Sequence, residues 1–203
     1  MDFITHFQKC ERSCSKIVRP DFNMLEEYEF MSDDEDECDL LYDQYLEDSN
    51  INWISQLRLL EHLDMRRAYY ALQVNINLDA LQNMTSLVHL DLHGNNLSSS
   101  IPSWFGNLKK LEYLDLSECR LHGPIPNAFR NATSIELLDL SYNNLDSLPS
   151  WSFNEFEKLK HLFLSSNNLQ GPISNALRNM TSIKTLDFFL ETLSLQFHPS
   201  LLS

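Results

Sequence analysis

A repeat of 24 residues is the feature that most restricts the fold of this sequence. The pattern L-x-x-L-x-L occurs five times, and each copy begins 24 residues after the one before it. The anchors of the five copies are Leu87/Leu90/Leu92, Leu111/Leu114/Leu116, Ile135/Leu138/Leu140, Leu159/Leu162/Leu164 and Ile183/Leu186/Phe188. A fixed period of this length is typical of solenoids, in which each repeat contacts mainly its neighbours. The sequence therefore predicts a stack of about five similar coils.

Each repeat predicts one short strand and a return path. Leucines that alternate with polar residues place the leucines on one face of a strand and the polar residues on the other. A single coil would leave its leucine row exposed, so the coils must stack to bury it. Pairs such as Ile101-Pro102 and Ile125-Pro126 suit an edge strand or an extended stretch, because proline cannot donate a ladder hydrogen bond. The expected fold class is an α/β solenoid, a right-handed superhelix with a curved parallel β-sheet on its concave face and short helical or irregular turns on the other.

The turn after each strand carries a column of residues that we expect to form an internal ladder. Its members are Asn95, Cys119, Asn143 and Asn167. An asparagine amide can donate to and accept from backbone groups that a tight corner would leave without partners. Cys119 replaces one rung, and we interpret it as a buried structural thiol, because apolar surroundings make a thiol unreactive.

The repeats resemble the plant-specific class of leucine-rich repeat, L-x-x-L-x-x-L-x-L-x-x-N-x-L-x-G-x-I-P. The clearest copy runs from Leu111 to Pro126 and holds Gly123 and the Ile125-Pro126 pair. The stretch 51–57, followed by Leu60 and Leu63-Asp64-Met65, is similar to an early degenerate repeat of plant receptor-like proteins. This resemblance implies an extracellular, membrane-anchored receptor or receptor-like protein, which senses peptide or microbial ligands and signals through a kinase partner.

Charge and repeat pattern together divide the chain into three parts. The net charge at pH 7 is −14, and residues 21–50 contain 13 Asp and Glu but no Lys or Arg. We expect residues 1–50 to form an acidic, flexible N-terminal region, with shielding of the first coil as its alternative role. Residues 51–190 form the expected solenoid of one degenerate repeat, four full 24-residue repeats and one partial repeat, and residues 191–203 form a divergent tail. The acidic balance argues against nucleic acid as a partner, because phosphate binding needs clustered Lys and Arg.

The outward residues of the strands are the candidate binding surface. Stacked strands place equivalent positions about 4.8 Å apart on one continuous face. One outward column varies from repeat to repeat, as expected for ligand selection, whereas the next is mostly aspartate and is interpreted mainly as structural. The candidate ligand-binding residues are His89, Asp91, Glu112, Tyr113, Asp115, Leu137, Asp139, His161 and Phe163.

The sequence offers no signature of an enzyme or a metal site. It lacks a Gly-rich phosphate loop, a G-x-S-x-G elbow and paired zinc cysteines, and it has only four glycines. His89 and His161 share a column but should lie three strands, about 14 Å, apart, which excludes a shared zinc ion. Neighbouring aspartates in one column lack the further oxygen ligands of a calcium cage. We therefore expect no catalytic residue, no metal and no cofactor.

Four Asn-x-Ser/Thr sequons occur, at Asn83, Asn96, Asn131 and Asn179. Asn83, Asn131 and Asn179 share one phase of the repeat, just before a strand, which predicts a common position away from the binding face. These motifs fit glycosylation sites, and they fit equally well a segment that only connects one repeat to the next strand. Glycosylation would need a secretory route, and the first ten residues lack the apolar core of a signal peptide. No stretch has the roughly 18 consecutive apolar residues that cross a bilayer.

Together these patterns favour a non-catalytic module for protein or peptide recognition, resembling the ectodomain of a plant receptor-like protein in defence or developmental signalling. The expected partners are a protein or peptide ligand and, by resemblance, a receptor-like kinase as co-receptor. The location implied by the resemblance is the extracellular face of the plasma membrane, with a cytoplasmic or secreted fragment as the alternative. The alternative function is an unanchored intracellular scaffold, or a truncated and decayed receptor gene product without a signalling role.

Overall fold

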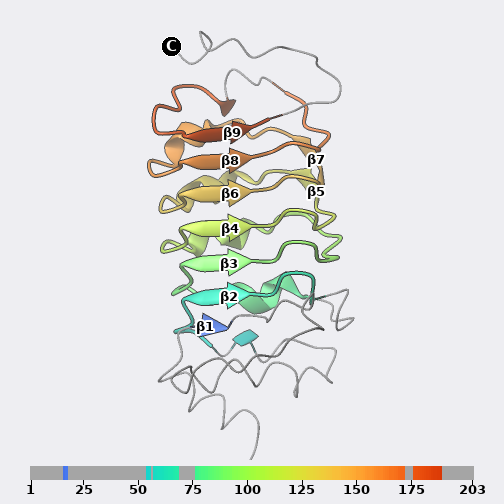
Figure 1. Cartoon of the computed structure of the whole chain (residues 1–203), viewed down its shortest axis with the longest axis vertical. Coiled ribbons are helices and arrows are strands. Elements are labelled where there is room, and N and C mark those ends of the chain that lie inside the picture. Colours follow the sequence, from blue (N-terminus) through green and yellow to red (C-terminus); the bar gives the residue numbers. More distant parts are fainter. Residues whose placement is uncertain (1–15, 18–53, 56, 69–75, 172–175, 189–203) are drawn as a thin grey trace, which may run out of the picture.

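In the described part of the chain, seven short strands stack into one parallel sheet that runs along the molecule (Figure 1). The computed structural model describes residues 16–17, 54–55, 57–68, 76–171 and 176–188. In order across the sheet, the strands are β1 (Lys16–Ile17), β2 (His62–Asp64), β3 (His89–Asp91), β4 (Tyr113–Asp115), β6 (Leu137–Asp139), β8 (His161–Phe163) and β9 (Thr185–Asp187). From β3 onward, each strand pairs with the equivalent residues of the next coil, so the 24-residue period of the sequence becomes the register of the sheet. The solenoid expected from the repeat is confirmed.

Between β2 and β8, each return path carries a turn of 3₁₀ helix, and two of these paths also carry a second strand. β5 (His122–Pro124) pairs in parallel with β7 (Asn144–Ser147) to form a small second sheet. The 3₁₀ helices are η3 (Leu78–Leu81), η4 (Ser103–Asn107), η5 (Asn127–Asn131) and η6 (Phe153–Glu155). Pro102 and Pro126 are extended residues that directly precede η4 and η5, where a missing N–H costs no ladder bond. Among the residues described, no helix has the length and apolar character required to cross a membrane.

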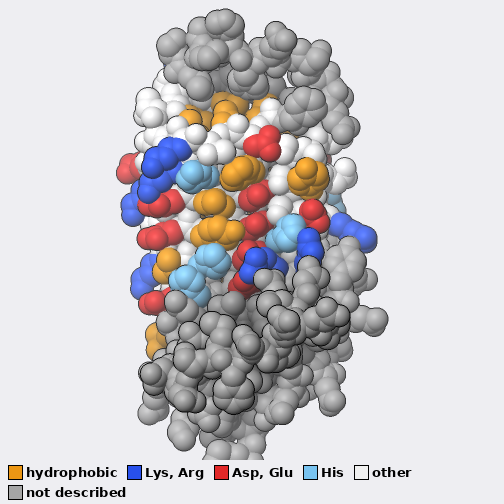
Figure 2. All heavy atoms as spheres, in the orientation of Figure 1, with side chains coloured by type: hydrophobic (Ala, Val, Ile, Leu, Met, Phe, Trp, Pro, Cys, Tyr) orange, Lys and Arg blue, Asp and Glu red, His pale blue; other side chains and the backbone are white. Residues whose placement is uncertain are grey.

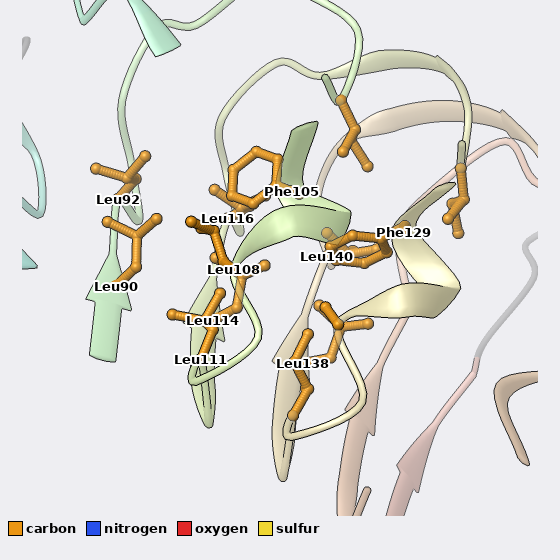
Figure 3. Packing of buried hydrophobic residues seen from close by; sticks show 14 of the residues in the cluster. Leu90, Leu92, Phe105, Leu108, Leu111, Leu114, Leu116, Phe129, Leu138 and Leu140 are labelled. Atoms are coloured by element: carbon orange, nitrogen blue, oxygen red, sulfur yellow. The ribbon is translucent and has the colours of Figure 1, made fainter. Parts of the chain in front are cut away.

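The core lies between the sheet and the 3₁₀ helices. The anchor leucines point inward from the strands and meet phenylalanines from the helical side (Figure 3). Phe105 and Phe129 are fully buried and pack edge to face, with ring centroids 6.0 Å apart, and Phe129 packs in the same way against Phe156 at 5.8 Å. Edge-to-face pairs place the positive rim of one ring against the negative face of the next. The core is therefore a continuous column that each coil extends.

Side-chain amides inside the turns connect successive coils. Asn143 Nδ2 donates to the carbonyl oxygens of Leu116 and Leu140 at 2.8 and 3.0 Å. Its Oδ1 accepts from the N–H groups of Cys119 and Leu121 at 3.1 and 2.9 Å. One side chain thus satisfies backbone groups of two coils, which a tight corner would otherwise leave buried without partners.

Cys119 occupies the position of an asparagine in this ladder. Its Sγ donates to the carbonyl oxygen of Leu92 at 3.0 Å, and the side chain is fully buried. Burial raises the pKa of the Cys119 thiol to about 12, so the thiol stays protonated at physiological pH. The cysteine therefore acts as a donor toward the preceding coil, as Asn95 and Asn167 do toward Met65 and Leu140.

The first coil joins the sheet with a different spacing. β2 pairs with β3 so that His62 lies opposite His89, a step of 27 residues instead of 24. β1 adds a further strand, because Lys16 and Ile17 pair in parallel with His62 and Leu63. Of the expected N-terminal region 1–50, Lys16–Ile17 are the only residues that the structure describes, and the expected tail 191–203 lies outside the described residues.

Candidate ligand-binding face

The outward side chains of β2, β3, β4, β6, β8 and β9 form one surface, which we call the strand face. Two columns run along it in the register of the sheet. The first, the variable column, holds His62, His89, Tyr113, Leu137, His161 and Thr185. The second, the aspartate column, holds Asp64, Asp91, Asp115, Asp139, Phe163 and Asp187. Figure 2 shows this face, with histidine and hydrophobic side chains in one column and acidic side chains in the column beside it.

Stacked rings make up the first half of the variable column. The rings of His62 and His89 are nearly parallel, with centroids 5.0 Å apart, and the ring of His89 lies 4.1 Å from that of Tyr113. All three side chains are half-buried, so each still presents part of its surface to solvent. Partial burial, together with the nearby His62, lowers the pKa of His89 below its usual value. The neutral imidazole that results can stack as an apolar ring with a polar edge.

The second half of the variable column is less aromatic. Leu137 follows Tyr113, and His161 follows Leu137 with its Nδ1 3.0 Å from Thr185 Oγ1. His89 and His161 therefore lie on strands three places apart, as the repeat phase predicts. No group of three or more His, Cys, Asp or Glu suited to a metal ion occurs within the described ranges.

The aspartate column has a structural task in its own turns. Oδ1 of Asp91, Asp115 and Asp139 accepts the backbone N–H of the residue two positions later, at 2.8 to 3.0 Å. Such bonds tie the end of each strand to the following turn. Burial raises the pKa of Asp91 to about 7 and also raises that of Asp139. These carboxylates thus remain partly desolvated even though each has a hydrogen-bond donor.

Arg66 lies over the first two members of the aspartate column. Its Nη2 and Nε donate to Oδ2 of Asp64 at 2.8 and 3.0 Å, and its Nε lies 3.5 Å from Oδ2 of Asp91. Asp64 and Asp91 are both buried, so this guanidinium partly compensates two carboxylates on neighbouring strands.

Residues of the first coil are the part of the face that sequence reasoning misses. His62, Asp64 and Arg66 belong to the same columns as the predicted residues, although they lie outside the 24-residue phase. The signal that could have found them is the Leu60, Leu63 and Met65 pattern, which marks a strand without giving its register.

The remaining predicted residues lie at the edges of the face. Glu112 is exposed directly before β4, and Phe163 takes an aspartate position in β8, where it is half-buried. Beside the same edge as Glu112, Lys160 Nζ donates to Glu136 at 2.6 Å. The residues that precede the strands thus include a carboxylate before β4 and an ion pair between the residues before β6 and β8.

The sequon asparagines lie in two different settings. Asn83, Asn131 and Asn179 are exposed, and Asn131 is the last residue of η5, on the return path and away from the strand face. Asn96 is half-buried, and its Oδ1 accepts from Ser98 Oγ at 2.5 Å.

A family model described as leucine rich repeat matches residues 72–121, 120–169 and 133–189. The chain belongs to the leucine-rich repeat family. Among the relatives of this leucine-rich repeat chain is Receptor-like protein 39 of Arabidopsis thaliana, 38% identical over 78 residues, which are 38% of this chain and 9% of that protein. A probable LRR receptor-like serine/threonine-protein kinase of the same plant is 41% identical over 56 residues, 27% of this chain and 6% of the kinase. The matches thus span less than a tenth of either relative. The resemblance to plant receptor-like proteins is confirmed.

Solved leucine-rich repeat ectodomains share the fold. The ectodomain of the Arabidopsis receptor kinase HAESA, in complex with an N-terminally extended IDA peptide hormone, aligns with a TM-score of 0.55 and 32% identity, over 65% of this chain and 22% of that one. A TDR receptor aligns with a TM-score of 0.53 and 28% identity, over 68% of this chain and 23% of that one. A further HAESA structure contains the IDA peptide and the co-receptor SERK1, with a TM-score of 0.50 and 27% identity over 68% of this chain and 27% of that one.

Proposed function

We propose that this leucine-rich repeat chain is a non-catalytic recognition module of the receptor-like type, which binds a peptide or protein ligand on its strand face. One observation carries the proposal. The inward column of the strands repeats leucine, whereas the variable column contains histidine, tyrosine, leucine and threonine side chains and remains partly open to solvent. Packing requires the first pattern, and it does not explain the second.

The related structures support a ligand of peptide type. HAESA holds a peptide hormone in one structure, and in another it holds the hormone together with a co-receptor. The chain matches about a quarter of that ectodomain. Because the two share this fold, we propose the same two classes of partner for this protein, a peptide or protein ligand and a receptor-like kinase co-receptor.

A binding experiment with a face variant tests this function. The full chain is immobilised and incubated with a library of capped random heptapeptides, and retained peptides are identified by mass spectrometry. We expect a set of peptides that the parent retains and that the Tyr113→Ala/Phe163→Ala variant loses, because both substitutions remove rings from the strand face. Tyr142→Ala is the matched control, since Tyr142 is 60% exposed and lies in the turn after β6 rather than on the strand face. Equal retention by the parent and the face variant would refute the proposal.

We further propose that the repeats occupy the extracellular side of the plasma membrane and carry glycans at Asn83, Asn131 and Asn179. Their exposure on the return path leaves room for a bulky glycan without covering the strand face. In plant cells, endoglycosidase treatment should change the mobility of the tagged chain, and each Asn→Gln change should remove one step. Asn96→Gln should remove none, because Asn96 is half-buried and bonded to the hydroxyl of its own sequon. An unshifted band in the parent would contradict the extracellular location.

A further inference from the structure

On the strand face, one arginine side chain already interacts with two neighbouring carboxylates. The guanidinium of Arg66 bonds Oδ2 of Asp64 and lies 3.5 Å from Oδ2 of Asp91. Since β2 and β3 pair in register, Asp64 and Asp91 are directly adjacent across the sheet. One planar cation can therefore serve two neighbouring members of the aspartate column.

The next two carboxylates pair across the sheet in the same way, but no described arginine or lysine is bonded to them. The imidazole that acts on Asp139 from a preceding coil is that of His93, whose Nδ1 lies 2.8 Å from Ser117 Oγ. Asp115 and Asp139 are directly opposite each other on β4 and β6. Oδ1 of Asp115 accepts from both N–H and Oγ of Ser117, and Oδ1 of Asp139 accepts from the same two groups of Ser141. No described residue donates to Oδ2 of either aspartate. The position that holds Arg66 in the first coil is held here by Ser117.

The surroundings of these two carboxylates favour an incoming cation. Both side chains are half-buried, and the pKa of Asp139 is raised, mainly because burial desolvates the carboxylate and further because the Asp115 charge is near. A cation held at this site would offset both effects. Tyr113 and Leu137, two residues earlier on the same strands, form a half-buried apolar border beside the carboxylates. Such a border suits the aliphatic stem of a long basic side chain, and a ring can also attract the cation itself.

We propose that Asp115 and Asp139, bordered by Tyr113 and Leu137, bind an arginine or lysine side chain of the ligand, in the way that Asp64 and Asp91 hold Arg66. This inference rests on the proposed recognition function and adds the chemical class of the ligand. The site selects a peptide with a basic side chain, and charge complementarity with the aspartate column sets its orientation on the strand face.

The composition of the retained heptapeptides tests the inference. Peptides retained by the parent and lost by the Tyr113→Ala/Phe163→Ala variant should be enriched in Arg or Lys. Retained peptides that depend on the strand face but lack basic residues would overturn the cation site and leave the recognition function standing. The absence of any peptide that depends on the strand face would overturn the recognition function itself.

Charge variants identify the carboxylates. Asp115→Asn/Asp139→Asn should weaken binding of a retained basic peptide at least about tenfold, because both charge-assisted bonds are lost while each Oδ1 can still accept from its serine. Asp146→Asn/Glu157→Gln is the control, since it removes two exposed carboxylates away from the strand face. Equal weakening in both double variants would mean that net charge acts alone, and the site would be rejected.

A gain of charge gives an independent test. Ser117→Arg places a guanidinium at the position equivalent to Arg66, where it should occupy Asp115 and Asp139 and block the basic peptide without removing any carboxylate. Its melting temperature shows whether the fold is retained. A folded Ser117→Arg variant that binds the peptide as tightly as the parent would overturn the inference. Binding to the parent should also weaken as pH falls through the acidic range, because a carboxyl with a raised pKa, such as that of Asp139, becomes protonated there and no longer holds the cation; Asp115 and His93 are the other titratable groups that act on it.

Discussion

The inward and outward residues of one strand are neighbours in sequence but obey different constraints. Leu90, Leu114 and Leu138 are fully buried and identical, whereas the residues directly before them on β3, β4 and β6 are histidine, tyrosine and leucine. The inward positions must match the coil above and the coil below, so a large apolar side chain recurs at each of them. The outward positions of the variable column contact mainly their cross-strand neighbours and remain partly open to solvent. Repetition in the leucine column therefore marks packing, and repetition in the aspartate column accompanies the turn bonds of its Oδ1 atoms. The changes in the variable column mark the places where different ligands could be selected.

The comparison predicts its largest contrast for two phenylalanines. Phe129→Ala should lower the free energy of unfolding by about 3–5 kcal/mol, because it opens a cavity between two edge-to-face partners in the core. Phe163→Ala, on the strand face, should cost about 1 kcal/mol or less, since that ring is only half-buried. Chemical denaturation of both variants measures the difference. Similar losses would show that the strand face also carries the stability of the fold.

The asparagine ladder should give the next largest effect. Asn143→Ala leaves the N–H groups of Cys119 and Leu121 without their acceptor and removes two donated bonds to carbonyl oxygens. Each buried group left unsatisfied costs about 1–3 kcal/mol, so we expect a loss of about 2–4 kcal/mol in thermal or chemical unfolding. Asn144→Ala, at the exposed position that follows, is the matched control and should change stability little. A small effect of Asn143→Ala would mean that water replaces the amide in the turn.

Asp91 belongs to an outward column but is buried like an inward residue, and its charge makes the stability of the fold depend on pH. Its pKa is raised to about 7 in the fold, against about 3.9 for an unfolded aspartate, so the folded state favours the protonated form. The stability contributed by this group is complete below pH 4 and is lost as pH rises through 7. Asp91→Asn keeps an oxygen that can accept the N–H of His93, and it should stabilise the fold by about 1–2 kcal/mol at pH 8 and by almost nothing at pH 4.

Unfolding free energies of the parent and Asp91→Asn from pH 4 to pH 8 measure this difference. The two curves should diverge as pH rises. Parallel curves would show that Arg66, which lies 3.5 Å from Asp91, compensates the buried charge completely.

Most of the architecture follows from the sequence because the solenoid is nearly periodic. Once Leu90, Leu114 and Leu138 are aligned, the strand register, the inward face and the position of the turn asparagines all follow from the same 24-residue step. The same step places His89 and His161 three strands apart. In such a fold, contacts between neighbouring coils are equivalent to contacts one period apart in sequence.

The first coil shows where this logic fails. His62 and Asp64 join their columns after a step of 27 residues, so the period assigns them no register. The stacking of His62 on His89 and the contact of Arg66 with Asp91 depend on where one strand lies beside the next. Those positions are set by the packing of residues between the strands, which a degenerate repeat does not reveal. The internal cation of the strand face was therefore found only in the structure.

The smallest expected effect comes from replacing the one cysteine of the turn ladder by asparagine, the residue of the other coils. Cys119→Asn should retain a donor toward the carbonyl oxygen of Leu92 and add an amide oxygen as acceptor for the N–H of Asn95, which now meets the sulfur. A sulfur atom is a weaker acceptor than an amide oxygen, so we expect a gain of about 0.5–1.5 kcal/mol in unfolding free energy. Cys119→Ala, which supplies neither group, should instead destabilise the fold and serves as the control. Inward side chains are constrained by the neighbouring coils that pack against them. A loss of stability in Cys119→Asn would therefore show that the turn at this position packs better around a cysteine than around the asparagine of the other coils.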